Sequence, residues 1–203
     1  ILMESEAYTS SPSDSQWTNH PYLLKAEGDI AFTKGVNRIV FHTFAHQPFP
    51  KLKPGFVMGP WGMHKHQGNT WFRSADVWYR YIGRCQHLLQ QGRFVADVLH
   101  YLGEEVPARA GFRDELHPRL PAGYDFDSCD WQALKEADVK DGIISLPSGM
   151  AYSVLLLPNK DAMRPAVLDR IAELISAGAT VVGRLPGRSP SLADGADGDA
   201  KVR

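Results

Sequence analysis

Two glutamates near the start of the chain have the residue type and position for acid–base chemistry. Glu4 and Glu6 lie in a short stretch, residues 1–7, that is rich in apolar side chains and is predicted to be a strand. Alternation along a strand places both carboxylates on the same side. Glu6 lies where this strand gives way to a loop, and a carboxylate held there can accept a proton as a general base. The alternative is an ordinary solvent-facing carboxylate.

A second group of polar residues follows the next predicted strand. His42, His46 and Gln47 each combine hydrogen-bond donors and acceptors, which suits the binding of hydroxyl groups. A network that caps the loop backbone is an equally simple interpretation. Trp61 and Trp71 offer flat apolar surfaces for stacking, although each also suits a core, and core is the preferred prediction for Trp71.

Two histidines and two cysteines suggest metal or redox chemistry but give little support for it. His64 and His66 would lie on one side of a strand, yet the segment is Gly-rich and has no third ligand at suitable spacing. We therefore predict no metal site there. Cys85 and Cys129 are too few for a disulfide framework and are predicted to be free thiols.

The overall composition is that of an ordinary globular protein. The chain has 203 residues and a net charge of -1, with 43% hydrophobic and 22% charged residues. A net charge this close to zero produces only a weak electrostatic field, so it gives no reason to expect nucleic acid or a membrane surface as a partner. Neither terminus resembles a natural chain end, so both are expected to be cuts in a longer protein.

The order of predicted elements indicates an α/β fold. In the first half, a strand over residues 1–7 precedes a helix with Asn19 as N-cap, and Gly35 ends that helix before a strand over 36–43. A long Pro/Gly loop over 45–68 leads to a helix that starts at Asn69 or Thr70. Its apolar stripe is Trp71, Ala75, Trp78, Ile82, Cys85 and Leu89.

The second half alternates in the same way. Strands are predicted over 94–101, 139–146, 151–157 and 179–182, with a short helix opened by Ser128 or Asp130 and a longer one opened by Pro165. This alternation favours an open sheet of flavodoxin-like type. The predicted domains are residues 1–92 and 93–185, followed by a flexible tail over 186–203.

Nine short stretches, taken together in order, resemble a known family of enzymes. They are EAYTS (6–10), GVNRIVFH (35–42), AHQP (45–48), GPWG (59–62), NTW (69–71), RCQHLLQQG (84–92), FVAD (94–97), GYDFD (123–127) and LPSGM (146–150). Each is weak alone, but the series resembles the C-terminal part of the catalytic region of glycoside hydrolase family 106, the α-L-rhamnosidases, over about residues 1 to 192. Between Gly62 and Asn69 the chain departs from the family pattern.

The resemblance implies a fold and a set of roles. The fold would be the last strand–helix units of a (β/α)8-type barrel, followed by a flavodoxin-like, glutamine-amidotransferase-like α/β domain. The family cleaves terminal α-L-rhamnosyl residues with inversion, so Glu6 would be the general base, and the acid would lie on an earlier strand. His42, His46, Gln47, Trp61 and Glu4 would contact the sugar, with Glu4 as the rival base.

The resemblance also links the family to calcium in the full-length protein. Glu4, Glu6 and Asp14 are too few for the oxygen shell that calcium needs, so any such site would be partial here. The second domain is expected to be a structural companion, because its cysteines lack the setting of an amidotransferase nucleophile and its first loop has Glu104 and Glu105 where a flavodoxin binds phosphate. The competing hypothesis is a non-catalytic α/β module for binding or assembly.

Overall fold

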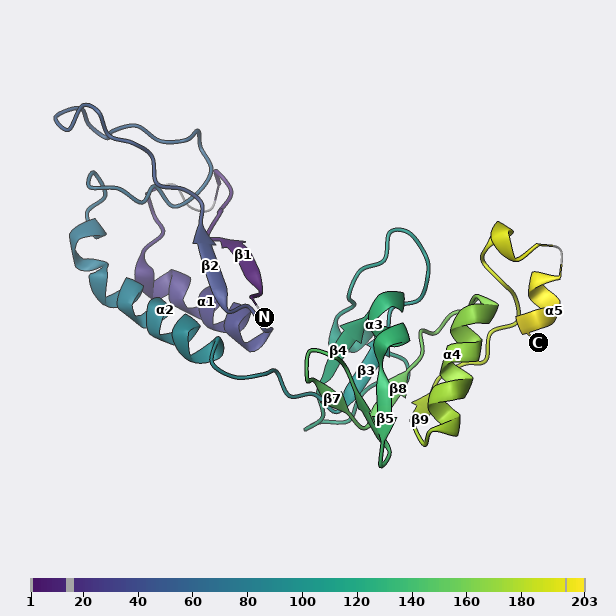
Figure 1. Ribbon diagram of the computed structural model, residues 1–203. Coiled ribbons are helices and arrows are strands. Elements are labelled where there is room, and N and C mark those ends of the chain that lie inside the picture. The colour runs from purple at the N-terminus through teal and green to yellow at the C-terminus, as the bar shows by residue number, and fades with distance from the viewer. Residues whose placement is uncertain (1, 14–16, 196, 203) are drawn as a thin grey trace. The chain divides into compact units, whose positions relative to one another are not determined.

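The computed structural model describes residues 2–13, 17–195 and 197–202. Asp14, one of the predicted oxygen donors, lies outside the described residues, and so does Ile1. The chain divides into two compact units, Ile1–Arg93 and Phe94–Arg203, each with its own sheet and core. Figure 1 shows the elements of both units. Both free cysteines are confirmed, with Cys129 buried and Cys85 half-buried.

The first unit is a strand–helix–strand unit with a following helix. Its elements are β1 (Glu4–Ala7), α1 (Pro21–Thr33), β2 (Arg38–Phe41), the 3-10 helix η1 (Phe72–Ser74) and α2 (Asp76–Leu89). β1 and β2 pair in parallel, with Glu4 opposite Arg38 and Glu6 opposite Val40. The predicted parallel pair joined by a helix is therefore confirmed.

The two faces of the β1–β2 pair differ in what covers them. Ile39, Ala7 and Phe41 belong to a core that also contains Leu24 of α1 and Trp78 of α2, so one face packs on the helices (Figure 1). Alternation turns the other set of side chains to the opposite face, where they are exposed. That bare face carries Glu4, Glu6, Arg38 and Val40. Three apolar side chains of this region, those of Leu2, Met3 and Val40, are exposed, whereas Ile39 is buried.

The starts of the two helices differ from the predictions. His20, not Asn19, is the N-cap of α1, and Pro21 is its first residue. Asn19 instead donates from its side chain to Ser10 Oγ at 2.7 Å. α2 starts at Asp76, later than predicted, because residues 72–74 form a 3-10 turn. Gly35 ends α1 as predicted, with a φ of 95° that an L side chain adopts only with strain.

One edge of the small sheet is partly occupied by side chains of α2 and of its C-cap residue. Gln86 Oε1 accepts a hydrogen bond from the backbone N–H of Ile39 at 2.6 Å. Gln90 Nε2 donates to the backbone carbonyl of Asn37 at 2.7 Å. Two glutamines one helical turn apart thus take the place of a neighbouring strand along β2.

The second unit contains a four-stranded parallel sheet and a three-stranded antiparallel sheet. Its larger elements are β3 (Val98–Tyr101), β4 (Phe126–Cys129), α3 (Trp131–Glu136), β8 (Val154–Leu156), α4 (Pro165–Ser176) and β9 (Thr180–Val182). The parallel sheet has the order β4-β3-β8-β9. The smaller elements are η2 (Arg113–Glu115), β5 (Asp138–Lys140), β6 (Ile143–Ser145), β7 (Ala151–Tyr152), η3 (Leu192–Asp194) and α5 (Gly198–Val202).

The strands of this unit depart from the predictions at three places. The strand predicted over 139–146 is a hairpin, β5–β6, with Asp141 and Gly142 at positive φ in its turn. The strand predicted over 151–157 is divided between the two sheets as β7 and β8. β4 was not predicted, because its alternating Asp and Phe residues resemble a polar loop. The predicted helix openings at Asp130 and Pro165 are confirmed, since Asp130 Oδ1 accepts from Ala133 N and α4 begins at Pro165.

The core of the second unit lies between its sheets and helices. Leu99 of β3 and Leu155 of β8 are fully buried, and Val167, Ile171 and Leu174 of α4 pack in the same cluster. The apolar run of β8 is thus buried on both faces, as expected for the middle of a parallel sheet. Residues 186–203, predicted as a flexible tail, contain η3 and α5, and Ser189 N donates to Asp199 Oδ1 at 2.9 Å.

Candidate active site

Glu6 lies at the carboxyl end of β1, on the bare face. Its Oε1 accepts a hydrogen bond from Thr9 Oγ1 at 2.6 Å. Among the described residues no cation pairs with Glu6, and its strand neighbour on β2 is Val40. The carboxylate is therefore held by a neutral hydroxyl and remains open to solvent. A carboxylate in this state can accept a proton from water without first breaking an ion pair.

Glu4 lies on the same face as Glu6, but its carboxylate forms an ion pair. Its Oε1 lies 3.0 Å from Nε of Arg38, the residue directly opposite it on β2. The guanidinium stabilises the charged carboxylate and occupies one of its oxygens. Of the two candidate bases, the structure leaves Glu6 free and engages Glu4.

His42 and His46 follow β2 directly and differ in exposure. The backbone N–H of His42 continues the ladder by donating to the carbonyl of Ala7 at 3.4 Å. The His42 residue is half-buried, and its Nδ1 is covered and has no hydrogen-bond partner among the described residues. A side chain on Gly62 would come within 2.9 Å of the His42 carbonyl, which explains a glycine at that position. His46 is exposed. Contact of either ring with sugar stays a prediction.

Gln47 uses its side-chain amide inside the loop. Nε2 donates to the carbonyls of Ala45 and Phe56, at 3.1 Å and 2.6 Å. Oε1 accepts from the backbone N–H of Phe56 at 3.0 Å. The alternative interpretation, a network that caps the loop backbone, therefore describes this residue in the present structure.

Trp61 and Trp71 differ in exposure, and only for Trp71 was a core position the preferred prediction. Trp71 packs edge-on against Trp78, with ring centroids 6.4 Å apart, and its Nε1 donates to the carbonyl of Asn19 at 2.8 Å. The core prediction for Trp71 is confirmed. Trp61 is 51% exposed, which leaves its ring free for stacking against a ligand.

His64 and His66 lie together in a turn rather than on a strand. Both rings are buried against Trp17, with centroid distances of 4.7 Å and 5.5 Å. His66 Nδ1 accepts from Gly68 N at 3.0 Å, and burial lowers the pKa of both imidazoles. In the part of the chain that the structure describes, no group of three His, Cys, Asp or Glu residues gathers around a common point. This pair therefore packs an aromatic cluster in the loop.

Lys65 is a feature that sequence reasoning missed. Its Nζ lies 3.8 Å from the centroid of the Phe41 ring and 5.3 Å from that of Tyr79. Burial among these rings lowers the pKa of the amine. The contact fastens the loop after β2 to the helix-covered face, so it positions the loop rather than facing the bare side.

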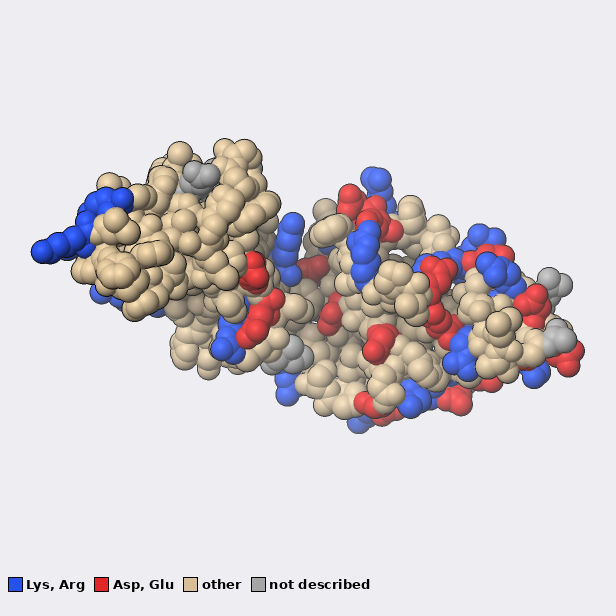
Figure 2. Space-filling view, turned by 90° about the horizontal axis from the view of Figure 1, so that it is seen from above, with Lys and Arg blue, Asp and Glu red and all other residues tan. Residues whose placement is uncertain are grey.

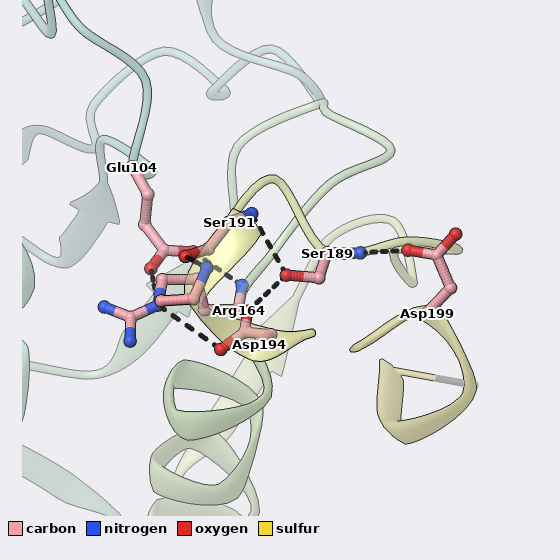
Figure 3. Close-up of polar contacts among 7 residues, drawn as sticks. Glu104, Arg164, Ser189, Ser191, Asp194 and Asp199 are labelled. Carbon is pink, nitrogen blue, oxygen red and sulfur yellow. Dashed lines mark hydrogen bonds and ion pairs between the residues drawn. The ribbon is translucent and has the colours of Figure 1, made fainter. Parts of the chain in front are cut away.

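The carboxyl ends of the parallel strands in the second unit carry a different arrangement (Figure 3). Glu104, which follows β3, accepts from the backbone N–H of Arg164 at 2.7 Å, and its side chain is only 12% exposed. Nε of Arg164 also lies 4.0 Å from Glu104 and 3.9 Å from Asp194. Burial raises the pKa of Glu104, and Arg164 partly offsets this.

The same edge is where an open α/β sheet usually binds ligands. The connections from β3 and β8 run to opposite sides of the sheet, which makes the crevice between their carboxyl ends the expected site. Here Lys160 pairs with Glu105 at 2.6 Å, and the Lys160 side chain packs close to Gly103. Both charged groups at this edge are therefore paired within the unit itself. Cys129 is buried, and burial raises the pKa of its thiol to about 12, so it is not a nucleophile.

Comparisons with known proteins identify the family to which the chain belongs. The α-L-rhamnosidase profile of glycoside hydrolase family 106 matches residues 2–202, and the chain belongs to that family. A solved rhamnosidase from Novosphingobium sp. PP1Y is similar over 99% of this chain, with a TM-score of 0.85 and 32% identity. The fold is thus a mixed α/β arrangement with parallel sheets that matches part of a rhamnosidase.

A protein of Formosa agariphila named "Putative beta-glucuronidase" is 40% identical over 187 residues, or 92% of this chain. This chain spans 16% of that relative and 20% of the rhamnosidase structure. Among the described residues, no helix is both long and apolar enough to cross a membrane.

Proposed function

We propose that these residues are part of a glycoside hydrolase that cleaves terminal α-L-rhamnosyl residues with inversion, and that Glu6 is its general base. In this mechanism Glu6 takes a proton from water while the water oxygen bonds to the anomeric carbon. The bond to the leaving oxygen breaks, and a second carboxyl group protonates that oxygen. We propose that the second group lies on a part of the catalytic region outside these 203 residues.

The observation that carries the proposal is the state of Glu6. It ends a parallel strand, faces the bare side of the sheet and has a hydroxyl rather than a cation as its partner. Glu4, the rival, is paired with Arg38. In the proposed enzyme the substrate approaches this open end, where the segment after β2 carries His42, His46 and Trp61.

The arrangement of both units supports the fold that we propose for the parent protein. Parallel strands joined by a helix, with helices on one face and carboxylates on the other, are what two consecutive units of a (β/α)8-type barrel require. In chain order the four-stranded sheet runs 2-1-3-4, which corresponds to the first four strands of a flavodoxin-like sheet.

Calcium, associated with the family, finds no adequate shell among the described residues. Glu4 is engaged by Arg38, and no cluster of three ligands forms. No step of the proposed mechanism is therefore assigned to a metal. Glu6 could at most contribute one oxygen to a site completed elsewhere.

A β-glucuronidase activity is the second candidate, because the relative from Formosa agariphila carries that name. The two activities differ in the sugar recognised and in the need to bind a carboxylate at the sugar itself. Assays of the full-length parent on an aryl α-L-rhamnoside and an aryl β-D-glucuronide separate them. Turnover of the glucuronide alone would transfer the proposal to the second candidate.

The role of Glu6 is tested by Glu6→Gln in the full-length parent. The amide keeps the shape but cannot accept a proton, so kcat should fall by roughly 10³-fold or more with little change in KM. Glu4→Gln is the matched control on the same face. Near-normal turnover in Glu6→Gln together with loss in Glu4→Gln would move the role of base to Glu4.

A further inference from the structure

The middle of the first unit contains no acidic residue over a long stretch. Between Asp29 and Asp76 the sequence has neither Asp nor Glu, while it includes Lys34, Arg38, Lys51, Lys53, Lys65 and Arg73. The whole chain has a net charge of only -1. A basic region in a nearly neutral chain produces a local positive field where the exposed cations gather.

The exposed part of this stretch is a closed loop. The amide of Gln47 bonds to the backbone of Phe56 in both directions, at 2.6 Å and 3.0 Å. Within that closure Leu52 N donates to the carbonyl of Phe49 at 3.0 Å, which forms a turn. Residues 48–56, here called the basic tip, are therefore held in a defined shape by backbone and amide contacts.

The basic tip presents two lysines and aromatic surface to solvent. Lys51 and Lys53 are exposed, and neither forms an ion pair with a described residue. Phe49 is 61% and Phe56 45% exposed, and their rings lie 6.0 Å apart. In Figure 2 the upper surface of the first unit is mostly uncharged, with basic side chains projecting at its end. Cations beside exposed rings are a surface that fits charged sugars.

The loop that carries the tip returns to the end of the unit where Glu6 lies. It leaves β2 at His42, and on its return Gly62 N donates to the carbonyl of Ser10 at 3.0 Å, just after β1. β1 and β2 are parallel, so both of these anchors are at the carboxyl end of the strands. The tip therefore extends from the same end as the proposed base.

We propose that the basic tip binds the anionic groups of an acidic polysaccharide, carboxylate or sulfate, on sugars beyond the one that is cleaved. This rests on the proposed function only in taking the ligand to be a carbohydrate. Lys51 and Lys53 contact the anionic groups, and Phe49 and Phe56 contact the sugar rings. Within the loop that carries the tip, Lys65 is held among aromatic rings, so Lys51 and Lys53 are the loop cations that face solvent.

The test is affinity electrophoresis of the 203-residue chain in gels that contain polygalacturonate, dextran sulfate or neutral dextran. The chain should be retarded by at least one of the two polyanions and not by dextran, and the retardation should decrease with salt. In the double variant Lys51→Gln/Lys53→Gln, affinity for that polyanion should drop about tenfold at low salt. The matched control is Lys135→Gln/Lys140→Gln, which removes two exposed lysines from the second unit.

Each outcome bears on the proposal. Loss in the tip variant with retention in the control supports it, and the gel that responds identifies carboxylate or sulfate as the group bound. Equal retardation by dextran, no effect of the tip substitutions, or an equal loss in the control would overturn it. Because binding is measured without turnover, these results are independent of the Glu6→Gln assay in the parent.

Discussion

Both units place a glutamate at the carboxyl end of a parallel strand, but in opposite states. Glu6, the penultimate residue of β1, is exposed and accepts one hydrogen bond from Thr9. Glu104, after β3, is mostly covered and holds the N-terminus of α4 by accepting from Arg164 N at 2.7 Å. The position in the fold is similar, and the partners decide the role. A carboxylate satisfied by its own unit supports structure, whereas one left open is available to substrate.

The two units also differ in how completely their sheets are covered by buried residues. In the second unit buried residues come from strands, from α3 and from α4, and β8 is covered on both faces. In the first unit the buried cluster covers only one face of β1 and β2. The second unit is therefore complete around its sheet, and the first offers a bare face to something else.

The largest effect that we expect is a complete lack of turnover by the 203-residue chain on an aryl α-L-rhamnoside. An inverting site needs two carboxyl groups about 6.5–9.5 Å apart, and loss of the acid alone costs typically 10²–10⁴-fold. The other glutamate on the bare face, Glu4, is paired with Arg38. If the 203-residue chain did turn over the substrate and Glu6→Ala abolished that activity, the first unit would contain a complete active site. The description of the first unit as incomplete would then be wrong.

The contrast in packing predicts a difference between two matched truncations. Leu155→Ala, in the fully buried middle of β8, should lower the free energy of unfolding by about 2–5 kcal/mol. Val40→Ala, on the bare face of β2, should lower it by less than about 1 kcal/mol. Urea unfolding followed by circular dichroism measures both. Equal losses would show that the bare face is packed in solution, for example by self-association.

The state of Glu104 predicts a dependence of stability on pH. Burial raises its pKa above the ordinary value of 4.5, so the folded form holds the proton more tightly than the unfolded form. Its contribution is present below about 4.5 and is lost as pH rises through the folded pKa. Glu104→Gln keeps an acceptor for Arg164 N and should abolish this decline. Unfolding free energies of both proteins from pH 4 to 8 provide the measurement, and parallel curves would contradict the prediction.

The smallest effect concerns the ion pair on the bare face. Glu4→Gln removes the contact with Arg38, which is exposed, so the unfolding free energy should change by no more than about 1 kcal/mol. Thermal unfolding at low and high salt checks this. A larger loss of unfolding free energy would indicate that Glu4 has a further structural role besides its ion pair with Arg38. The contrast between a paired Glu4 and an unpaired Glu6 would then be incomplete.

The sequence predicted those elements whose signals are local. Pro21 and Pro165 open helices, Gly35 and Gly178 follow their ends, and the apolar run of β8 marks a buried strand. The division between β7 and β8 was not predictable, because one continuous run of strand residues serves two sheets. β4 was missed since its buried position depends on pairing with β3, a contact distant in sequence.

The features of the candidate site also separate into those that local sequence predicts and those that depend on contacts distant in sequence. The strand end at Glu6 and the core role of Trp71 follow from local pattern. The partner of Glu4 does not, because Arg38 is brought to it only by the register of β2. In the same way, the closure of the loop by Gln47 depends on Phe56, nine residues away, and the position of Lys65 depends on rings from β2 and α2.

The two glutamines of α2 have a consequence for solubility. A strand with an open row of N–H and carbonyl groups is a template on which other chains can add strands and aggregate. Gln86 and Gln90 bond to the backbone of Ile39 and Asn37, so along β2 the row is partly occupied before another chain can reach it. In the 203-residue chain, these two contacts should therefore reduce the tendency of the β2 edge to pair with another chain.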